Sequence, residues 1–151
     1  MPTAFDVPAE PLLKRVAEAL RKEAGVEPPV WASFAKTGIH KEKAPSSSDW
    51  WYVRAAAVLR KVYVKGPIGS TRLSAEYGGK ADNGSAPSHA QRGSRAISRL
   101  MLKQLEKAGY VQAIPKQGRR ISAKGQKLLD SVAREVLKEL IQQNPGLAKL
   151  A

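Results

Sequence analysis

The stretch from Trp50 to Lys65 limits the fold more than any other part of this chain, because apolar residues recur along it with the period of a helix. At about 100° per residue, one stripe of such a helix carries Trp51 and the alanine and valine positions that follow it, and a second apolar stripe lies beside it. A third line holds cations, among them Arg54 and Lys61. We therefore expect a largely buried helix with one cationic edge, around which the rest of the chain forms a core.

The positive charge of the chain is concentrated in its middle half. Lysine and arginine number 26 against 13 aspartate and glutamate, a formal net charge of +13, and 16 of these cations but only 3 of the acids fall within residues 50–127. Residues 1–49 hold 7 of each sign, and residues 128–151 hold 3 of each. Solubility does not require such segregation, whereas neutralising a phosphate backbone requires a concentrated basic surface. The charge pattern therefore indicates a nucleic-acid partner.

Length and composition exclude several other classes of protein. At 151 residues the chain fits a single domain, and its 42% hydrophobic content suffices for a core. The lack of cysteine excludes a disulfide framework, a thiolate zinc site and a cysteine nucleophile. The sequence has neither a run of about 18 apolar residues nor a basic-then-apolar signal pattern at its start. We expect a soluble intracellular protein.

Catalysis and metal binding find little support in the sequence. The basic segment has three carboxylates, Glu76, Asp82 and Glu106, and their spacing does not place two on one face for general acid/base work. The two histidines, His40 and His89, are far apart in sequence and lack the spacing of metal ligands. We therefore predict that the protein is not an enzyme and has no catalytic residue, metal or cofactor.

The N-terminal third is expected to serve as scaffold. Residues 1–7 are predicted to be a loose tail, and residues 8–24 an amphipathic helix with mixed charges. Residues 30–49 are predicted to be a connector held in the core by its large apolar side chains, which are Val30, Trp31 and Phe34. The polar run that ends at Asp49 offers several good N-cap residues for the helix that follows.

Glycine gathers between residues 66 and 93, which hold six of the twelve glycines of the chain. Within this segment, residues 70–77 fit two turns of helix, and the remainder is predicted to be loop. A compact domain rarely carries so long a connection without a use for it, so the segment is either disordered or a binding element. Because glycine lets a backbone lie close to a ligand, we interpret residues 66–93 as a glycine-rich binding loop.

Residues 94–143 follow the order helix, glycine, short strand, basic turn, short strand, helix. Ser94 and Ser122 are suitable caps for the two helices, and residues 110–121 can form the hairpin between them. This order is the outline of a winged-helix module whose wing is the hairpin. We therefore predict a mainly α fold over residues 1–151, a single domain built as a helical bundle with a winged-helix-like module and a short β-hairpin wing near the C-terminus.

The residues predicted to bind nucleic acid are mostly cations, because lysine and arginine neutralise phosphates and arginine and aromatic planes stack on unpaired bases. Along residues 94–108 cations recur every fourth residue, in a row that would repel itself in isolation. In an average protein such a row is simply a solvated helix face, but here it coincides with the segregated charge. Arg119 and Arg120, at the end of the hairpin, are hard to explain by packing. The full predicted set is Trp50, Arg54, Arg60, Lys61, Lys65, Arg72, Lys80, His89, Arg92, Arg95, Arg99, Lys103, Arg119 and Arg120.

Several short motifs occur in an order that is specific to one known family. They are Pro29-Val30-Trp31, Lys43-Ala44-Pro45, Trp50-x-Tyr52-x-Arg54-Ala55-Ala56, then Arg60, Tyr63 and Gly66, Tyr77-Gly78-Gly79, Pro87-Ser88-His89-x-x-Arg92-Gly93-Ser94 and Leu105-Glu106. Over nearly its whole length the chain resembles ribosomal protein nineteen of the small subunit, the type found in archaea and eukaryotes.

This resemblance implies a mostly helical, winged-helix-like protein in the head of the small ribosomal subunit, bound to ribosomal RNA and needed for maturation of that subunit. The family's important basic positions correspond to Arg54, Arg60 and the Arg95/Arg99 region, and its glycine-rich loop to residues 78–93. The chain departs from the family in the acid-containing part of that loop, residues 80–83. The implied partners are small-subunit ribosomal RNA and other small-subunit proteins, and we expect a cytoplasmic protein of archaeal type that is monomeric when it is not on the ribosome.

A winged-helix transcription regulator is the alternative. Its recognition helix would be residues 94–108, lying in the major groove of DNA, with Arg119 and Arg120 on the wing. Such regulators are commonly dimers on two-fold operators, so a monomer without preference for a palindrome would count against this alternative. An enzyme acting on RNA is a third class, and it is left without a catalytic constellation.

Overall fold

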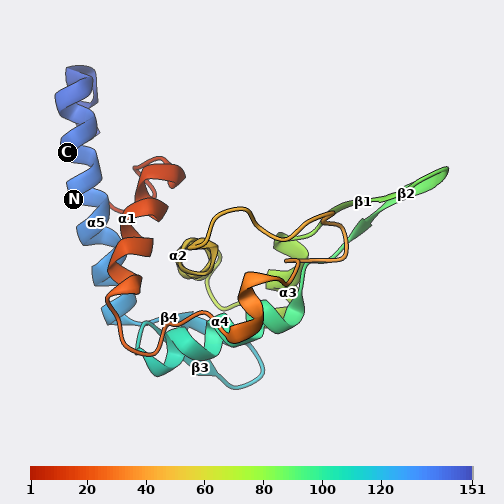
Figure 1. Cartoon of the computed structure of the whole chain (residues 1–151). Coiled ribbons are helices and arrows are strands. Elements are labelled where there is room, and N and C mark those ends of the chain that lie inside the picture. The colour runs from red at the N-terminus through yellow and green to blue at the C-terminus, as the bar shows by residue number, and fades with distance from the viewer. Residues whose placement is uncertain (151) are drawn as a thin grey trace.

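The computed structural model describes residues 1–150, most of which are helical (Figure 1). In chain order the elements are α1 (Ala9–Arg21), the 3-10 helix η1 (Val30–Ser33), α2 (Trp50–Lys65), α3 (Ser70–Glu76), β1 (Gly79–Asn83), β2 (Ala86–Gln91), α4 (Arg95–Lys107), β3 (Val111–Ile114), β4 (Gly118–Ile121), α5 (Ala123–Gln143) and η2 (Pro145–Leu150). The strands form two antiparallel hairpins, β1–β2 and β3–β4. The prediction of a mainly α protein is confirmed.

Helix α2 lies at the centre of the core, as its periodicity predicts. It is seen nearly end-on in Figure 1, and α1, α4 and α5 all pack against it. Its first apolar stripe is fully buried, and so are two residues of the second stripe; together they are Trp51, Ala55, Ala56, Val58, Leu59 and Val62. Because these faces are covered, only the remaining side of α2 can meet a partner.

The side chain of Trp51 ties α2 to two other parts of the chain. Its Nε1 donates to Oε1 of Gln104 in α4 at 2.9 Å, and Nε2 of Gln104 donates to the carbonyl of Glu27 at 2.7 Å. The ring of Trp31 meets the ring of Trp51 edge to face, with centroids 5.8 Å apart. Replacing a buried tryptophan by alanine typically costs about 3–5 kcal/mol, so Trp51 is a structural anchor rather than a binding residue.

The prediction of a loose tail at residues 1–7 is wrong. Ala4 and Val7 are buried in the core, and the Ala4 amide donates to Oδ1 of Asp130 in α5 at 3.2 Å. The same carboxylate oxygen accepts from the Tyr63 hydroxyl of α2 at 3.0 Å. The segment carries no periodic pattern that would have shown this, because its order comes from a residue more than a hundred positions away.

The prediction for the connector is also partly wrong. Val30 and Phe34 do not anchor it, since their side chains are 91% and 71% exposed. The buried residue of the single turn η1 is Ala32, while Trp31 packs against the core from its edge. In one turn of helix the apolar residues point in different directions, and size alone does not tell which of them faces inward.

Helix ends follow the predicted cap chemistry in two of three cases. The hydroxyls of Ser94 and Ser122 accept from the amides of Ile97 and Gly125 at 3.3 and 3.2 Å. Asp49 occupies the N-cap position of α2, but its carboxylate accepts from Arg21 and Ser47 instead of from the helix. An acidic residue near a helix N-terminus is favourable even without a direct cap.

The β3–β4 hairpin is confirmed, and it joins an additional segment by backbone hydrogen bonds. Val111 pairs with Ile121 and Ile114 with Gly118. Ile68 exchanges two backbone hydrogen bonds of 3.0 Å with Arg119. The hairpin is therefore tied to the residues between α2 and α3.

The prediction that residues 78–93 are loop is wrong for most of that range. β1 and β2 form a hairpin, with Gly79 opposite Gln91 and Ala81 opposite His89, and it projects from the body of the molecule (Figure 1). Asp82 accepts from the Gly84 amide and the Asn83 side chain donates to a carbonyl across the turn, both at 2.9 Å. All six residues of β2 are exposed, so the strand lacks the alternation of apolar residues by which strands are recognised.

Candidate nucleic-acid interface

The cationic edge of α2 is present, and two of its three lysine and arginine side chains share one acid. Lys61 and Lys65 each reach a carboxylate oxygen of Glu76 in α3 at 3.1 Å. Hydrogen bonds from Lys61 and then Lys65 hold the pKa of the Glu76 carboxyl below its ordinary value. Two cations against one acid leave a net positive charge at this position, and the two lysines are held in place.

Arg54 is bound differently, because it rests on an aromatic ring instead of an acid. Its guanidinium carbon lies 4.1 Å from the centroid of the Tyr77 ring, and the side chain is largely buried. Within residues 1–150 the structure gives Arg54 no carboxylate partner. Burial lowers the pKa of the Arg54 guanidinium, against the favourable effect of Tyr77. Burying a charge without an opposite charge is unfavourable, so this site is suited to an anion that comes from outside.

The tyrosine beneath Arg54 is itself buried. Desolvation raises the pKa of the Tyr77 hydroxyl to about 12, and the hydroxyl has no hydrogen-bond partner among the described residues. Nε of Arg60, one turn and a half further along α2, is likewise buried without a partner in that part of the chain. Both groups belong to the same basic region as Arg54.

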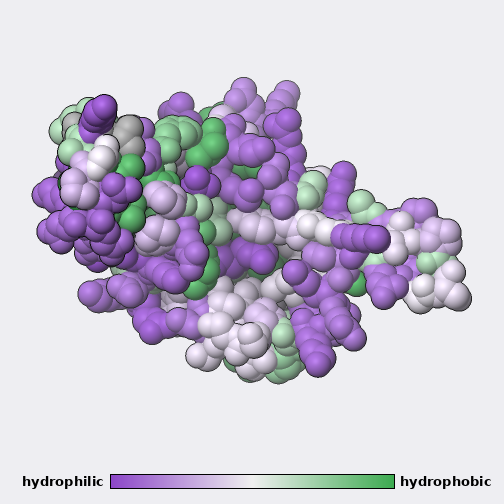
Figure 2. Space-filling model, turned by 90° about the horizontal axis from the view of Figure 1, so that it is seen from above, coloured by the Kyte–Doolittle hydropathy of each residue, from purple (hydrophilic) through white to green (hydrophobic). Residues whose placement is uncertain are grey.

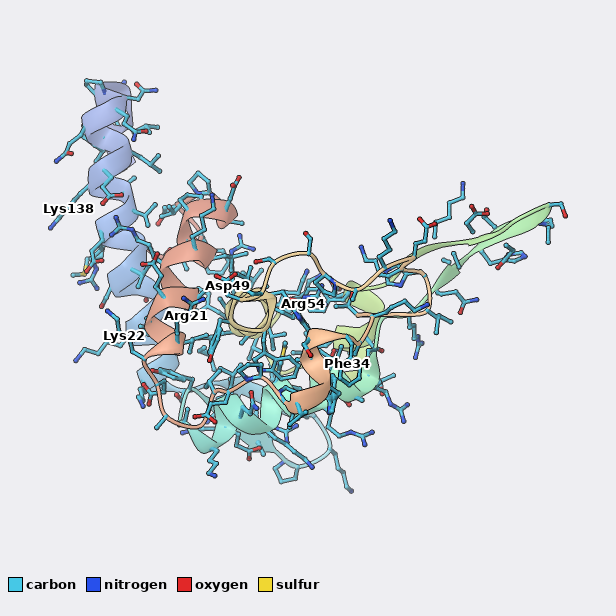
Figure 3. The ribbon with its side chains drawn as sticks, in the orientation of Figure 1. Arg21, Lys22, Phe34, Asp49, Arg54 and Lys138 are labelled. Carbon is cyan, nitrogen blue, oxygen red and sulfur yellow. The ribbon has the colours of Figure 1, made fainter. Side chains whose placement is uncertain are left out.

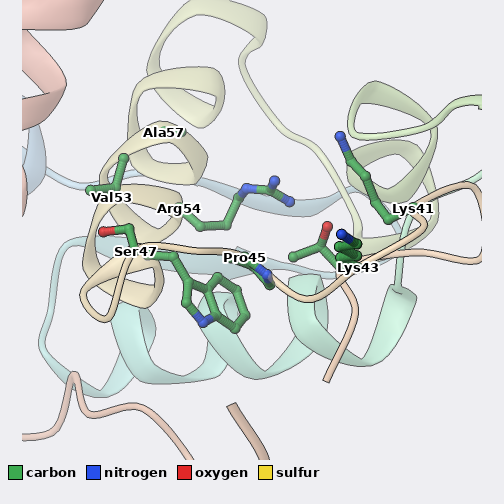
Figure 4. Close-up of a pocket in the computed structure, with 9 residues that line it drawn as sticks. Lys41, Lys43, Pro45, Ser47, Val53, Arg54 and Ala57 are labelled. Atoms are coloured by element: carbon green, nitrogen blue, oxygen red, sulfur yellow. The ribbon is translucent and has the colours of Figure 1, made fainter. Parts of the chain in front are cut away.

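Arg54 also lines a pocket of about 450 Å³ between α2 and the connector (Figure 4). Lys41 and Lys43 reach it from the connector, and one face of α2 supplies Trp50 and Val53. Nε1 of Trp50 donates to the carbonyl of Ala32 at 3.0 Å, which fixes the ring at the pocket wall. Arg54 extends from α2 toward the connector loop and α3 (Figure 3).

Sequence reasoning missed Lys41 and Lys43. They lie in a stretch whose charges balance, so counting charge over residues 1–49 concealed them. The motif Lys43-Ala44-Pro45 contains one of the two lysines, but a short motif does not by itself show which of its side chains face a ligand. The structure brings both lysines to the same pocket as Arg54.

The cationic row of α4 is exposed over its full length, as predicted. It consists of Arg95, Arg99, Lys103 and Lys107. None of the ion pairs found in residues 1–150 involves these side chains. Glu106, an acid on the same helix, pairs with Arg119 of β4 instead. The row therefore keeps its full charge.

Arg119 has a structural partner, so the argument that packing could not explain it is wrong. Its Nε donates to Oε2 of Glu106 at 2.8 Å, and its backbone pairs with Ile68. The acid lies 13 residues away in sequence, which is too far for a local pattern to reveal. Arg120, its neighbour, is exposed. For both arginines a contact with nucleic acid stays a prediction.

The remaining predicted cations lie on other parts of the surface. Arg72 lines a second hollow together with Lys116 and Gly118 of the β3–β4 turn, so α3 and this turn are neighbours. Lys80, His89 and Arg92 are exposed on the β1–β2 hairpin or at its base, and the hairpin carries the first two away from α2. Hydrophilic side chains cover much of the face shown in Figure 2, including parts of the projecting hairpin.

Two negative findings apply to the described residues 1–150. No group of three or more histidine, cysteine, aspartate or glutamate side chains there could hold a metal ion. Nor is any helix in this range long and apolar enough to cross a bilayer.

Comparison with known proteins gives matches over almost the entire chain. The model of the family described as ribosomal protein S19e matches residues 3–139. Small ribosomal subunit protein eS19 of Thermoplasma acidophilum is 48% identical over 143 residues, which is 95% of either chain. The protein of the same name from Aeropyrum pernix is 48% identical over 151 residues, 99% of either chain. Small ribosomal subunit protein eS19A of Schizosaccharomyces pombe is 40% identical over 134 residues, covering 89% of this chain and 93% of its own.

Proposed function

The chain belongs to the ribosomal protein S19e family, and from this membership we propose that it is a structural constituent of the small ribosomal subunit and not an enzyme. The observation that carries the proposal is the 48% identity, over 99% of both chains, with a protein named small ribosomal subunit protein eS19. The resemblance drawn from the sequence motifs is thereby confirmed, and archaeal proteins are among the relatives. The place of action is the cytoplasmic ribosome.

We further propose that the protein binds small-subunit ribosomal RNA through its basic face and contributes to maturation of the subunit. Three features support this. The excess charge lies within residues 50–127, the α4 row is exposed and unneutralised, and Arg54 is largely buried on a tyrosine ring without an acid. Each phosphate neutralised releases condensed counterions, which makes such binding strong at low salt and weaker as salt rises.

The order of elements also supports the winged-helix-like description, with residues 1–151 as one domain. α3 and α4 pack against each other, and the hairpin β3–β4 acts as the wing. Strand β4 gains a second backbone partner, besides β3, through Ile68. In this arrangement α4 occupies the place of the recognition helix, with its cations facing solvent. The DNA-binding regulator is not retained as a function, because relatives that share the full length of the chain are named as ribosomal proteins.

The experiment that tests the proposed function is sedimentation of a lysate in a sucrose gradient, at moderate and at high salt, with the protein followed by mass spectrometry. We expect stoichiometric migration with the small subunit, persisting until the salt is high enough to displace many phosphate contacts. Recovery at the top of the gradient at every salt concentration would refute the proposal.

A pair of charge-reversal variants tests the binding face. Arg95→Glu/Arg99→Glu changes two exposed side chains of α4 and should prevent incorporation while the helical circular dichroism stays that of the wild type. Lys22→Glu/Lys138→Glu is the matched control, since it makes the same change of net charge at exposed positions on the other side of α2 from Arg54 (Figure 3). Normal incorporation of the α4 variant would show that this face does not bind RNA.

A further inference from the structure

The pocket between the connector and α2 combines three cations with an aromatic wall and has no acid. Lys41 and Lys43 line it from the connector, and Trp50, Val53 and Arg54 line it from α2. We propose that this pocket binds one unpaired nucleotide of the RNA, with its phosphate on Arg54, Lys41 and Lys43 and its base against Trp50. The inference rests on the proposed function, and it names the ligand of one site within the basic face.

Arg54 is already positioned to bind a phosphate. The guanidinium is held over Tyr77 at 4.1 Å, so its planar fork of donors is positioned before any ligand arrives. A guanidinium so placed can donate two parallel hydrogen bonds to a phosphate. Lys41 and Lys43 approach from the connector on the opposite side of the pocket (Figure 4). An anion entering between them would meet positive charge from two elements of the chain.

Asp49, at the N-cap of α2, does not line the pocket, and its carboxylate has hydrogen-bond partners of its own. Oδ2 of Asp49 accepts from Arg21 at 2.9 Å, and Oδ1 accepts from the hydroxyl of Ser47 at 2.6 Å. These hydrogen bonds, that from Ser47 first, hold the pKa of the Asp49 carboxyl below its ordinary value. The carboxylate is therefore held by partners of its own, and none of the ion pairs found within residues 1–150 involves Lys41, Lys43 or Arg54.

The Trp50 ring and the Val53 side chain give the pocket an apolar wall against which a base can lie. The Trp50 ring is fixed by its hydrogen bond to Ala32 and by an edge contact with Trp51 at 5.4 Å between centroids. Val53 is an apolar side chain that stays 39% exposed at the same place. Stacking of a base on an aromatic side chain is worth about 1–3 kcal/mol by alanine substitution and tolerates any base. A fixed ring beside a phosphate site is thus the arrangement that an unstacked nucleotide needs.

Size and shape favour a single nucleotide over a duplex. The volume of about 450 Å³ falls in the range of small-molecule pockets, roughly 300–1,000 Å³. A double helix offers its phosphates along a convex surface and keeps its base faces stacked, so it could use the lysines but not the pocket wall. An unpaired nucleotide can place both its phosphate and its base inside.

Photocrosslinking in assembled small subunits tests the proposal. p-Benzoylphenylalanine introduced at Val53 should crosslink to one nucleotide that is unpaired in the subunit RNA. The same group at Val64 is the matched control, because Val64 is on the same helix and 40% exposed. Crosslinks from position 53 to protein alone, or to base-paired nucleotides, would overturn the proposal, and so would the same nucleotide reached equally from position 64.

A charge variant gives an independent measurement. Lys41→Gln/Lys43→Gln changes two exposed side chains and should weaken binding to protein-free small-subunit RNA about ten-fold, with the slope of log affinity against log salt reduced by roughly 1. Lys22→Gln/Lys138→Gln should change neither quantity. Equal affinity and slope for the pocket variant and this control would refute the phosphate site.

The two proposals fail in different ways. If the wild-type protein does not migrate with small subunits, the proposed function is wrong. If the wild type migrates with them but position 53 gives no RNA crosslink, only the nucleotide pocket is wrong.

Discussion

Replacing Arg54 by methionine separates a binding role of this residue from a structural one. Methionine has similar length and can keep contact with the Tyr77 ring, but it carries no charge. In the wild type the guanidinium stacks on that ring at 4.1 Å, is largely buried and has no acid partner among residues 1–150. The variant therefore removes a charge that the fold does not pair.

The expected effect on stability is small, because the losses and gains nearly cancel. A partly desolvated cation–π contact contributes about 1–2 kcal/mol, and a methionine–ring contact returns about 0.3–1.5 kcal/mol. The variant also avoids the cost of desolvating the charge. The free energy of unfolding should thus change by no more than about 1 kcal/mol, which for a domain of this size corresponds to a melting-temperature shift of roughly 2–4 °C.

The expected effect on RNA binding is large by comparison. A hydrogen bond to a charged group contributes about 1.5–3 kcal/mol, so loss of one phosphate contact should weaken affinity for small-subunit RNA by roughly 10- to 150-fold. Calorimetric melting of the isolated protein and filter binding to protein-free RNA measure the two quantities. Lys22→Met, at an exposed position remote from the pocket, should leave both unchanged.

One pattern of results would refute this reasoning. If Arg54→Met lowers the melting temperature by more than about 6 °C while the affinity for RNA stays at the wild-type value, Arg54 stabilises the fold and does not bind phosphate.

Two further predictions concern the scaffold. The Tyr110 hydroxyl donates to Oε2 of Glu23 at 2.9 Å; burial, then this bond, raises the pKa of Tyr110 to about 12, and hydrogen bonds from Tyr110 and Lys124 lower the pKa of Glu23. The contribution of Tyr110 to the free energy of unfolding should be complete below pH 10 and should be lost as pH rises toward 12. The contribution of Glu23 should be complete above the ordinary pKa of 4.5 and should be lost as pH falls through the lowered pKa of Glu23. Tyr110→Phe should therefore destabilise by about 1–2 kcal/mol at neutral pH and by less at either extreme, as denaturant melts across pH would measure. Gly118→Ala should also be destabilising. Gly118 has φ +96°, a strained conformation for alanine that costs about 1–3 kcal/mol, and the added Cβ would lie 2.6 Å from the Ile68 carbonyl carbon, which adds to this cost.

Each of these predictions has its own control. Glu23→Gln should remove the part of the acid-induced loss of stability that comes from Glu23. A Tyr110→Phe protein whose stability follows the wild-type pH curve would contradict the hydrogen-bond assignment. Gly84→Ala is the control for Gly118→Ala, because Gly84 also has a positive φ, +68°, but nothing lies within 4 Å of the added Cβ. It should cost less than Gly118→Ala, and an equal loss at both glycines would show that the contact with Ile68 contributes nothing.

Features set by local chemistry could be predicted from the sequence. The period of residues 50–65 placed the buried stripes of α2 correctly, and the hydroxyls of Ser94 and Ser122 cap the helices that they were expected to cap. The β3–β4 hairpin was found because turn residues separate two β-prone runs. In each case the signal lies within a few residues of the element it specifies.

Features set by distant partners could not be predicted. The β1–β2 hairpin has one strand exposed throughout, so its sequence lacks the alternation that marks a strand. Arg119 was assigned to the surface because Glu106, its partner, is not a neighbour in sequence. Lys41 and Lys43 could be recognised as part of a site only when the connector was seen to lie against the cationic edge of α2.

The contact between the two ends of the chain has a consequence for the order of folding. The hydrogen bond from Ala4 to Asp130 spans 126 residues, and α1 packs on α5. At synthesis rates of about 5–20 residues per second, roughly 6 to 25 seconds separate the two partners. During that interval the nascent chain presents the apolar stripes of α2 and its cationic edge before α5 is available to complete the core. The face carried by α2 and α4 is thus synthesised before the core beneath it is complete, so the earliest step at which the whole face can recognise RNA comes after synthesis of α5.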